Sequence, residues 1–186
     1  MKKQKFVILL ILFALLTTVS FAQHTDKPWK IYGVDKPMTK LMSRYYKTPE
    51  IKVVSVGQNM HYTDDVSVCL YLAQATGTNP FKIRDWRVKA ISWMDIMAKL
   101  KFNSARLFTQ VGGYSVPATY RHAYREYYKW RSNKKYQMTL YDKEVRNLVQ
   151  LKFMVGRFKV SPKKVMLMRS GGKNFTEMIM SELKKK

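Results

Sequence analysis

Between residues 104 and 138 the chain combines aromatic and basic side chains at a density that suggests binding chemistry. If residues 119–131 form a helix, tyrosines spaced four residues apart form one stripe and basic residues form the adjacent stripe. Arginine and lysine can neutralise phosphates or carboxylates, while tyrosine rings can stack on a sugar, a base or a lipid headgroup. The sequence therefore predicts an anion-binding surface in this segment. Its candidate residues are Tyr120, Arg121, Tyr124, Arg125, Tyr128, Lys129 and Arg131.

A second interpretation of the same stripe stays open. The tyrosines can instead pack between neighbouring helices, with the basic side chains extending past them into water. The two interpretations differ in a measurable way, since a true polyanion site loses affinity steeply as salt rises.

Residues that could perform catalysis or bind a metal do not form a known pattern. His24, His61 and His122 lie far apart, and none has a partner at the spacing of metal ligands. Asp64 and Asp65 form a carboxylate pair, but acidic residues are favourable at a helix start for electrostatic reasons alone. We therefore predict no catalytic residue, no metal and no cofactor. An enzyme whose site is assembled only in three dimensions remains an alternative.

The composition is globular and strongly basic. The chain has 186 residues, of which 46% are hydrophobic, and its 35 Lys and Arg against 12 Asp and Glu give a formal net charge of +23. Such a surplus repels itself when the chain compacts. An anionic partner is thus expected, although a basic surface that only keeps the protein in solution is the alternative.

The N-terminus has the order of a secretory signal peptide. Lys2, Lys3 and Lys5 precede an apolar run over residues 6–16, and small residues lead to a cut predicted after Ala22. The apolar run is shorter than the roughly 18 to 20 residues of a spanning helix, which argues against an uncleaved anchor. The sequence predicts export, with a mature protein that is periplasmic or secreted.

An internal repeat at an offset of 82 residues organises the rest of the chain. When the sequence is aligned with itself so that Asn79-Pro80 matches Ser161-Pro162, Trp93 aligns with Phe175. Helix-start signals recur three times in the same order in each copy. The predicted fold is mainly α, with two related trihelical modules joined by a Tyr-rich basic connector. The predicted divisions are a signal peptide 1–22, an N-terminal arm 23–62, a first module 63–103, the connector 104–138 and a second module 139–186.

Local signals predict where these helices start and stop. Asn79 and Ser92 are expected N-caps, and Gly77 is an expected stop. Gly171-Gly172 should supply a left-handed stop in the second copy, where the first copy has only Lys89-Ala90. In the arm, residues 37–47 predict a short helix, and residues 51–56 predict a brief strand or an extended segment. Cys69 has no partner for a disulfide, and its apolar neighbours predict a buried thiol.

Two short motifs carry a resemblance. Residues 92–96 (SWMDI) and residues 168–175 (MRSGGKNF), with the Tyr-rich connector between them, resemble a group of uncharacterised exported bacterial proteins. The resemblance covers about two thirds of the mature chain and implies an exported two-copy helical protein. It implies no activity, ligand or catalytic residue. The chain departs from the group at residues 89–91 and in a connector with few glycines, so turn geometry can differ there.

Together these features predict a noncatalytic envelope protein that binds an anionic partner, namely a lipid headgroup, lipopolysaccharide or a wall polymer, with peripheral membrane contact. One alternative is an envelope enzyme with an unrecognised active site. The other is an extracytoplasmic nucleic-acid binder, since three short helices also occur in helix-turn-helix domains. Export argues against a transcriptional role.

Overall fold

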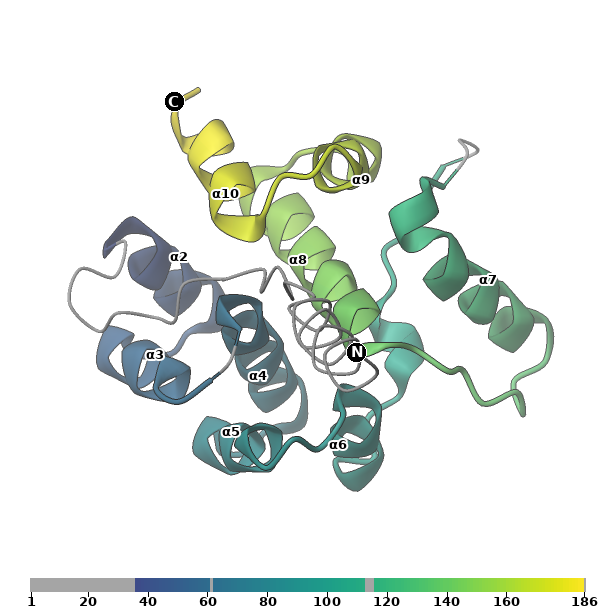
Figure 1. Ribbon diagram of the computed structural model, residues 1–186, viewed down its shortest axis with the longest axis horizontal. Coiled ribbons are helices and arrows are strands. Elements are labelled where there is room, and N and C mark those ends of the chain that lie inside the picture. The colour runs from purple at the N-terminus through teal and green to yellow at the C-terminus, as the bar shows by residue number, and fades with distance from the viewer. Residues whose placement is uncertain (1–35, 61, 113–115, 186) are drawn as a thin grey trace, which may run out of the picture.

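A computed structural model describes residues 36–60, 62–112 and 116–185, and every regular element in these ranges is helical (Figure 1). The prediction of a mainly α protein is thus confirmed. The predicted signal peptide, its cut after Ala22 and the arm up to residue 35 lie outside the described residues. The elements are α2 (Lys36–Tyr46), α3 (Glu50–Gly57), α4 (Thr63–Thr76), α5 (Pro80–Val88), α6 (Trp93–Lys99), the 3-10 helix η1 (Ser104–Leu107), α7 (Ala118–Ser132), α8 (Asp142–Phe158), α9 (Pro162–Ser170) and α10 (Phe175–Leu183).

Helices α4 and α8 form the centre of the molecule and pack against each other. Figure 1 shows α2 and α3 on one side of this pair, α7 on the opposite side, and α5 with α6 and α9 with α10 at the two remaining ends. Five consecutive residues of α8, 147–151, are buried, so the middle of this helix is enclosed on all sides, as expected of a central helix. Buried side chains from both predicted modules and from the arm form one hydrophobic cluster.

The helix starts predicted for the two modules are confirmed. α5 and α9 begin at Pro80 and Pro162, and α6 and α10 begin at Trp93 and Phe175, so both pairs of starts are 82 residues apart. Proline is favourable at a first helical position because its missing N–H would have no partner there. The caps also match: Asn79 Oδ1 accepts from the Phe81 N–H at 3.0 Å. The expected cap Ser92 accepts through its Oγ from the Asp95 N–H at 3.1 Å.

Left-handed turns follow α4, α5 and α9. Gly77 ends α4 with φ 71°, and Gly172 follows α9 with φ 92°. Ala90 adopts φ 59° at the corresponding point after α5, where no glycine predicted a left-handed turn. The backbone hydrogen bonds agree, since Ala90 N–H donates to Arg87 O at 2.9 Å and Gly172 N–H donates to Arg169 O at 3.1 Å. The turn after α5 thus has the same left-handed residue as the turn after α9 but without glycine, at a steric cost that an L-residue pays in this region.

Two helices in the segment predicted as an arm (residues 23–62), namely α2 and α3, contribute buried side chains to the core. α2 confirms the helix predicted over residues 37–47. The strand predicted at residues 51–56 is wrong, because this segment is the helix α3. Its Val53 and Val56, three residues apart, are fully buried, as helical spacing onto one face requires. Packing against α2 and α4 thus outweighs the strand preference of its valines.

A close approach between helices fixes α2 against α8. The Tyr45 hydroxyl donates to the Lys152 carbonyl at 3.3 Å, and the Tyr45 ring meets the Phe153 ring edge-on, with 4.7 Å between centroids. Gly156 makes room for this ring, because a Cβ at that position would lie 2.6 Å from the Tyr45 hydroxyl. No local sequence signal identified Gly156, near the C-terminal end of α8, as a contact point.

Candidate anion-binding surface

The predicted basic and aromatic stripe lies on α7, which runs along the edge of the molecule beside α8 and α9 (Figure 1). The helix follows Pro117, whose fixed φ suits a helix start. It spans the predicted range 119–131, so this element is confirmed. Its inner face packs Tyr120, Ala123 and Tyr124 into the core.

The tyrosine stripe divides between core and surface. Tyr120 and Tyr124 are 1% and 2% exposed. The Tyr124 hydroxyl donates to the Thr109 carbonyl at 2.7 Å, and its ring packs edge-on against Phe108. These two rings fill the interior, as the packing interpretation expects. Tyr128, with 46% of its surface exposed, is the tyrosine of the stripe that can offer a ring face to a ligand.

The basic stripe lies outside. Arg121, Arg125 and Lys129 are exposed, and they border a hollow of about 520 Å³ that opens to solvent. Five of the seven predicted site residues line this hollow, while Tyr120 lies in the core and Arg131 is exposed elsewhere on the helix. The lining consists of Val116, Arg121, Tyr124, Arg125, Tyr128, Lys129 and Ser132.

A buried carboxylate under this face was not predicted. Glu126 is 3% exposed, and it accepts from the Tyr136 hydroxyl at 2.6 Å, the Lys129 ammonium at 2.9 Å and the Thr139 N–H at 3.2 Å. Burial alone would raise the pKa of Glu126, but these hydrogen bonds outweigh it and lower the pKa to about 2. Glu126 therefore holds the chain after α7 in place and engages Lys129.

Arg121 and Arg125 differ from Lys129, because neither pairs with a carboxylate of the described residues. Within residues 36–60, 62–112 and 116–185, no ion pair involves either guanidinium. They are one helical turn apart, which places their Cβ atoms about 5 to 6 Å from each other. Two exposed guanidiniums beside an exposed tyrosine ring form a surface that can bind a phosphate or a carboxylate.

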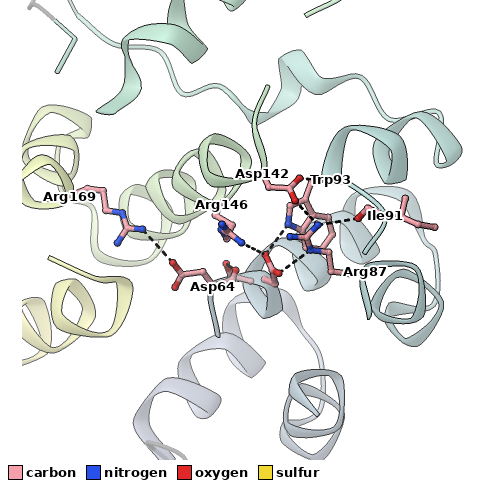
Figure 2. A network of polar contacts seen from close by, with 9 residues as sticks. Asp64, Arg87, Ile91, Trp93, Asp142, Arg146 and Arg169 are labelled. Carbon is pink, nitrogen blue, oxygen red and sulfur yellow. Dashed lines mark hydrogen bonds and ion pairs between the residues drawn. The ribbon is translucent and has the colours of Figure 1, made fainter. Parts of the chain in front are cut away.

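A second polar cluster joins α4, α5, α6 and α8 (Figure 2). Asp65, only 1% exposed, accepts from Arg87 Nε at 3.0 Å, Trp93 Nε1 at 2.9 Å and Arg146 at 3.2 Å. Arg87 also pairs with Asp142 at the start of α8. Although burial opposes its charge, these two carboxylates raise the pKa of Arg87. Asp65 was interpreted as a helix-start charge, and its role as the centre of this cluster could not be read from local sequence.

The cluster continues to Arg169 on α9, whose contacts parallel those of Arg87. Arg169 Nε donates to Asn147 Oδ1 at 2.9 Å, and one terminal nitrogen donates to the Lys173 carbonyl at 3.2 Å. Another lies 3.5 Å from Asp64, as Figure 2 shows. Because these charged groups have protein partners, the cluster is suited to holding helices together rather than to binding a ligand.

The remaining candidates for chemistry are few among the described residues. His122 Nδ1 lies 2.9 Å from Glu144 Oε1, and its ring stacks on Tyr141 with 5.1 Å between centroids. His24 and His61 lie outside the described part of the chain. Cys69 is buried, as predicted, and its Sγ donates to the Pro80 carbonyl at 3.1 Å. Burial raises the pKa of the Cys69 thiol well above its ordinary value, which disfavours the reactive thiolate.

Comparisons of the chain with protein-family models, curated proteins and solved structures find no match. Across the helices that the structure describes, none combines the length and the apolar character needed to cross a membrane. The exposed basic side of α7 is then the feature from which a function can be argued.

Proposed function

We propose that this protein is an exported, noncatalytic envelope component that binds an anionic partner through the basic face of α7. The basic face is defined as Arg121, Arg125, Tyr128 and Lys129. The observation that carries the proposal is the pair Arg121 and Arg125, which border an open hollow and have no carboxylate partner among the described residues. Guanidiniums bind phosphate and carboxylate through two parallel hydrogen bonds, which suits this chemistry.

The distribution of acidic residues supports the proposal. Asp65 and Glu126 are buried against cations, and Glu182 is buried between Lys164 and Lys185. Glu177 accepts from the Asn174 N–H at the start of α10. Carboxylates are thus largely engaged within the fold, while the surplus positive charge of the chain, +23 in total, remains to be matched from outside.

The signal-like N-terminus restricts which anions the protein would meet. If residues 1–22 act as the export signal, the basic face would meet lipopolysaccharide, acidic lipid headgroups or wall polymers. Mass spectrometry of the protein recovered from a secreting host tests this step. We expect a mature chain that begins at Gln23, and an intact Met1 on protein that stays in the cytoplasm would contradict it.

The two-copy organisation is part of the same proposal. We infer that α4–α6 and α8–α10 are copies of one trihelical unit, with α7 inserted between them. The matching helix starts support this. So do the equivalent bonds from Arg87 to the Ile91 carbonyl at 3.1 Å and from Arg169 to the Lys173 carbonyl at 3.2 Å. The copies then act as a scaffold, and the inserted helix carries the binding chemistry.

Salt-dependent binding of the mature chain tests the function. The protein is mixed with vesicles containing phosphatidylglycerol, with lipopolysaccharide and with a single-stranded oligonucleotide, each at rising salt. We expect affinity for an envelope anion that falls steeply with salt, because neutralised charges release counterions. Binding that is absent from all three at low salt would overturn the proposal, and binding to the oligonucleotide alone would favour the nucleic-acid alternative.

The variant for this test is Arg121→Gln combined with Arg125→Gln. Lys129 is left intact, because its removal would also take a hydrogen bond from buried Glu126. Arg131→Gln combined with Lys135→Gln is the matched control, because it also removes two positive charges from exposed residues that do not line the hollow. We expect the Arg121→Gln/Arg125→Gln variant to lose most of the binding and the control to keep it. Equal losses would show that only net charge matters.

A further inference from the structure

The chemistry of the hollow narrows the partner. We infer that the basic face of α7 binds a phosphate monoester carried on a sugar ring, as in the headgroup of a phosphorylated glycolipid. This inference rests on the proposed function and deepens it, because it selects one class among the envelope anions.

The charge around the hollow favours a doubly charged phosphate. Lys129 lies 2.9 Å from buried Glu126, so the two charges largely offset each other. Arg121 and Arg125 remain, which gives the lining a net charge of about two positive units. A phosphate monoester carries about −1.5 to −2 near pH 7, whereas a diester phosphate carries a single charge. The monoester therefore matches the pair of guanidiniums, and the diester of an ordinary phospholipid does not.

The spacing of the two arginines supports the same choice. Residues four apart on a helix lie side by side, about 5 to 6 Å apart at Cβ, and guanidiniums on flexible stems can converge on one tetrahedral group. A monoester presents three terminal oxygens to them, while a diester presents two. More donors can thus be satisfied by the monoester, and charge-assisted hydrogen bonds of this kind are the strong ones.

The exposed side chain of Tyr128 favours a ligand in which the phosphate is carried on a sugar ring. It is 46% exposed and lies one turn from Arg125 and from Ser132 along the rim of the hollow. Its neighbour Tyr127 is stacked between Phe108 and Trp130, at 4.5 and 5.8 Å between centroids, which limits the movement of this part of the helix. An exposed aromatic face beside an anion site suits a sugar, whose carbon–hydrogen face can lie on the ring. The hollow of about 520 Å³ has room for a phosphorylated sugar.

The test uses the mature chain and four neutral carrier vesicles that differ in one component. They contain phosphatidylglycerol (a diester), phosphatidic acid (a monoester without sugar), lipid A (monoesters on a glucosamine disaccharide) or a neutral glycolipid (sugar without phosphate), with the first three matched in total charge. We expect lipid A vesicles to bind at least about tenfold more tightly than phosphatidylglycerol vesicles. Tyr128→Ala should reduce this preference, because it should weaken binding to lipid A more than binding to phosphatidic acid.

The outcomes separate this inference from the proposed function. Equal affinity for phosphatidylglycerol and lipid A, with both lost in the Arg121→Gln/Arg125→Gln variant, would overturn the monoester inference and leave the proposed function standing. Equal affinity for phosphatidic acid and lipid A would overturn the sugar component. If none of the charged vesicles binds, both the inference and the proposed function fail.

Discussion

The arginines of this protein fall into two groups that differ in their surroundings. Arg87, Arg146 and Arg169 come from α5, α8 and α9, with 12 to 16% of their side chains exposed, and each contacts a carboxylate of α4. Arg121 and Arg125 on α7 are exposed and have no carboxylate partner among the described residues. The comparison teaches that position relative to acidic residues, rather than residue type, decides whether an arginine holds the fold or is available for a partner.

Substitutions in the two groups of arginines and their partners should therefore have opposite effects on stability and binding. Changes in the interface cluster should cost folding stability and affect binding only through unfolding. Changes on the basic face should cost binding and leave stability nearly unchanged.

Asp65→Ala should destabilise most, by about 3 to 5 kcal/mol, because it leaves Arg87, Arg146 and the Trp93 indole without their shared buried acceptor. Urea unfolding followed by circular dichroism measures this. Asp65→Asn introduces the residue type found 82 positions later, at Asn147 of α8. It should reduce the unfolding free energy by less than Asp65→Ala does.

Asp85→Ala is the control for that experiment. Asp85 also pairs with an arginine, Arg84, at 2.7 Å, but its side chain is 56% exposed. A solvent-exposed pair contributes about 0 to 1 kcal/mol. Similar losses for Asp65→Ala and Asp85→Ala would contradict the distinction between buried and exposed pairs.

Glu126→Gln should cost about 1.5 to 3 kcal/mol at neutral pH, because a carboxylate that accepts three hydrogen bonds is replaced by a neutral amide. The pKa of Glu126 in the folded protein is about 2, below its ordinary value of 4.5. Its stabilising contribution is therefore complete above about pH 4.5 and is lost as the pH falls toward 2. The difference in unfolding free energy between wild type and variant should shrink as the pH falls over this range. A constant difference would argue against a stabilising role of the ionised Glu126 carboxylate.

Gly156→Ala should destabilise by about 1 to 2 kcal/mol, because the new methyl group meets the Tyr45 ring, which is held against Phe153. Thermal unfolding measures the change. In the Tyr45→Phe background the closest atom, the hydroxyl oxygen, is absent, so the added cost of Gly156→Ala should fall. If Gly156→Ala reduces stability equally in the wild type and in the Tyr45→Phe variant, the Tyr45 hydroxyl is not the source of the strain.

Ala90→Gly should stabilise the protein by about 0.5 kcal/mol, since relief of the left-handed strain outweighs the extra flexibility of glycine in the unfolded chain. This substitution gives the turn after α5 the residue that the turn after α9 has at Gly172. The reverse change, Gly172→Ala, should destabilise. A loss of stability in Ala90→Gly, or no loss in Gly172→Ala, would undermine the equivalence of the two turns.

The combined change Arg121→Gln and Arg125→Gln should alter the unfolding free energy by no more than about 0.5 kcal/mol, because neither side chain is buried or paired within the described residues. Chemical unfolding in parallel with Asp65→Ala provides the contrast. A loss above 1 kcal/mol would mean that these arginines help to hold the fold.

Local sequence signals predicted the helices where a few adjacent residues decide the outcome. Asn79-Pro80 and Ser92 fixed helix starts because caps act within one turn. Residues 51–56 were predicted wrongly, because their valines favour strands and only contacts with α2 and α4 select the helix.

The site was predictable in part for the same physical reason. Four-residue spacing identified a basic stripe and a tyrosine stripe on α7, but spacing alone does not say which side faces the core. Tyr120 and Tyr124 turned inward, and Arg121 and Arg125 turned outward. The roles of Asp65 and Glu126 were missed, because their partners come from other elements or from a segment beyond the helix.

Binding of lipid A vesicles by the mature wild-type chain and by its Arg121→Gln/Arg125→Gln variant, side by side at low salt, tests the central claim most directly. If the unpaired arginines of α7 carry the function, the folded variant loses at least about tenfold in affinity, while the Arg131→Gln/Lys135→Gln control does not. An Arg121→Gln/Arg125→Gln variant that binds as tightly as the wild type would contradict the account.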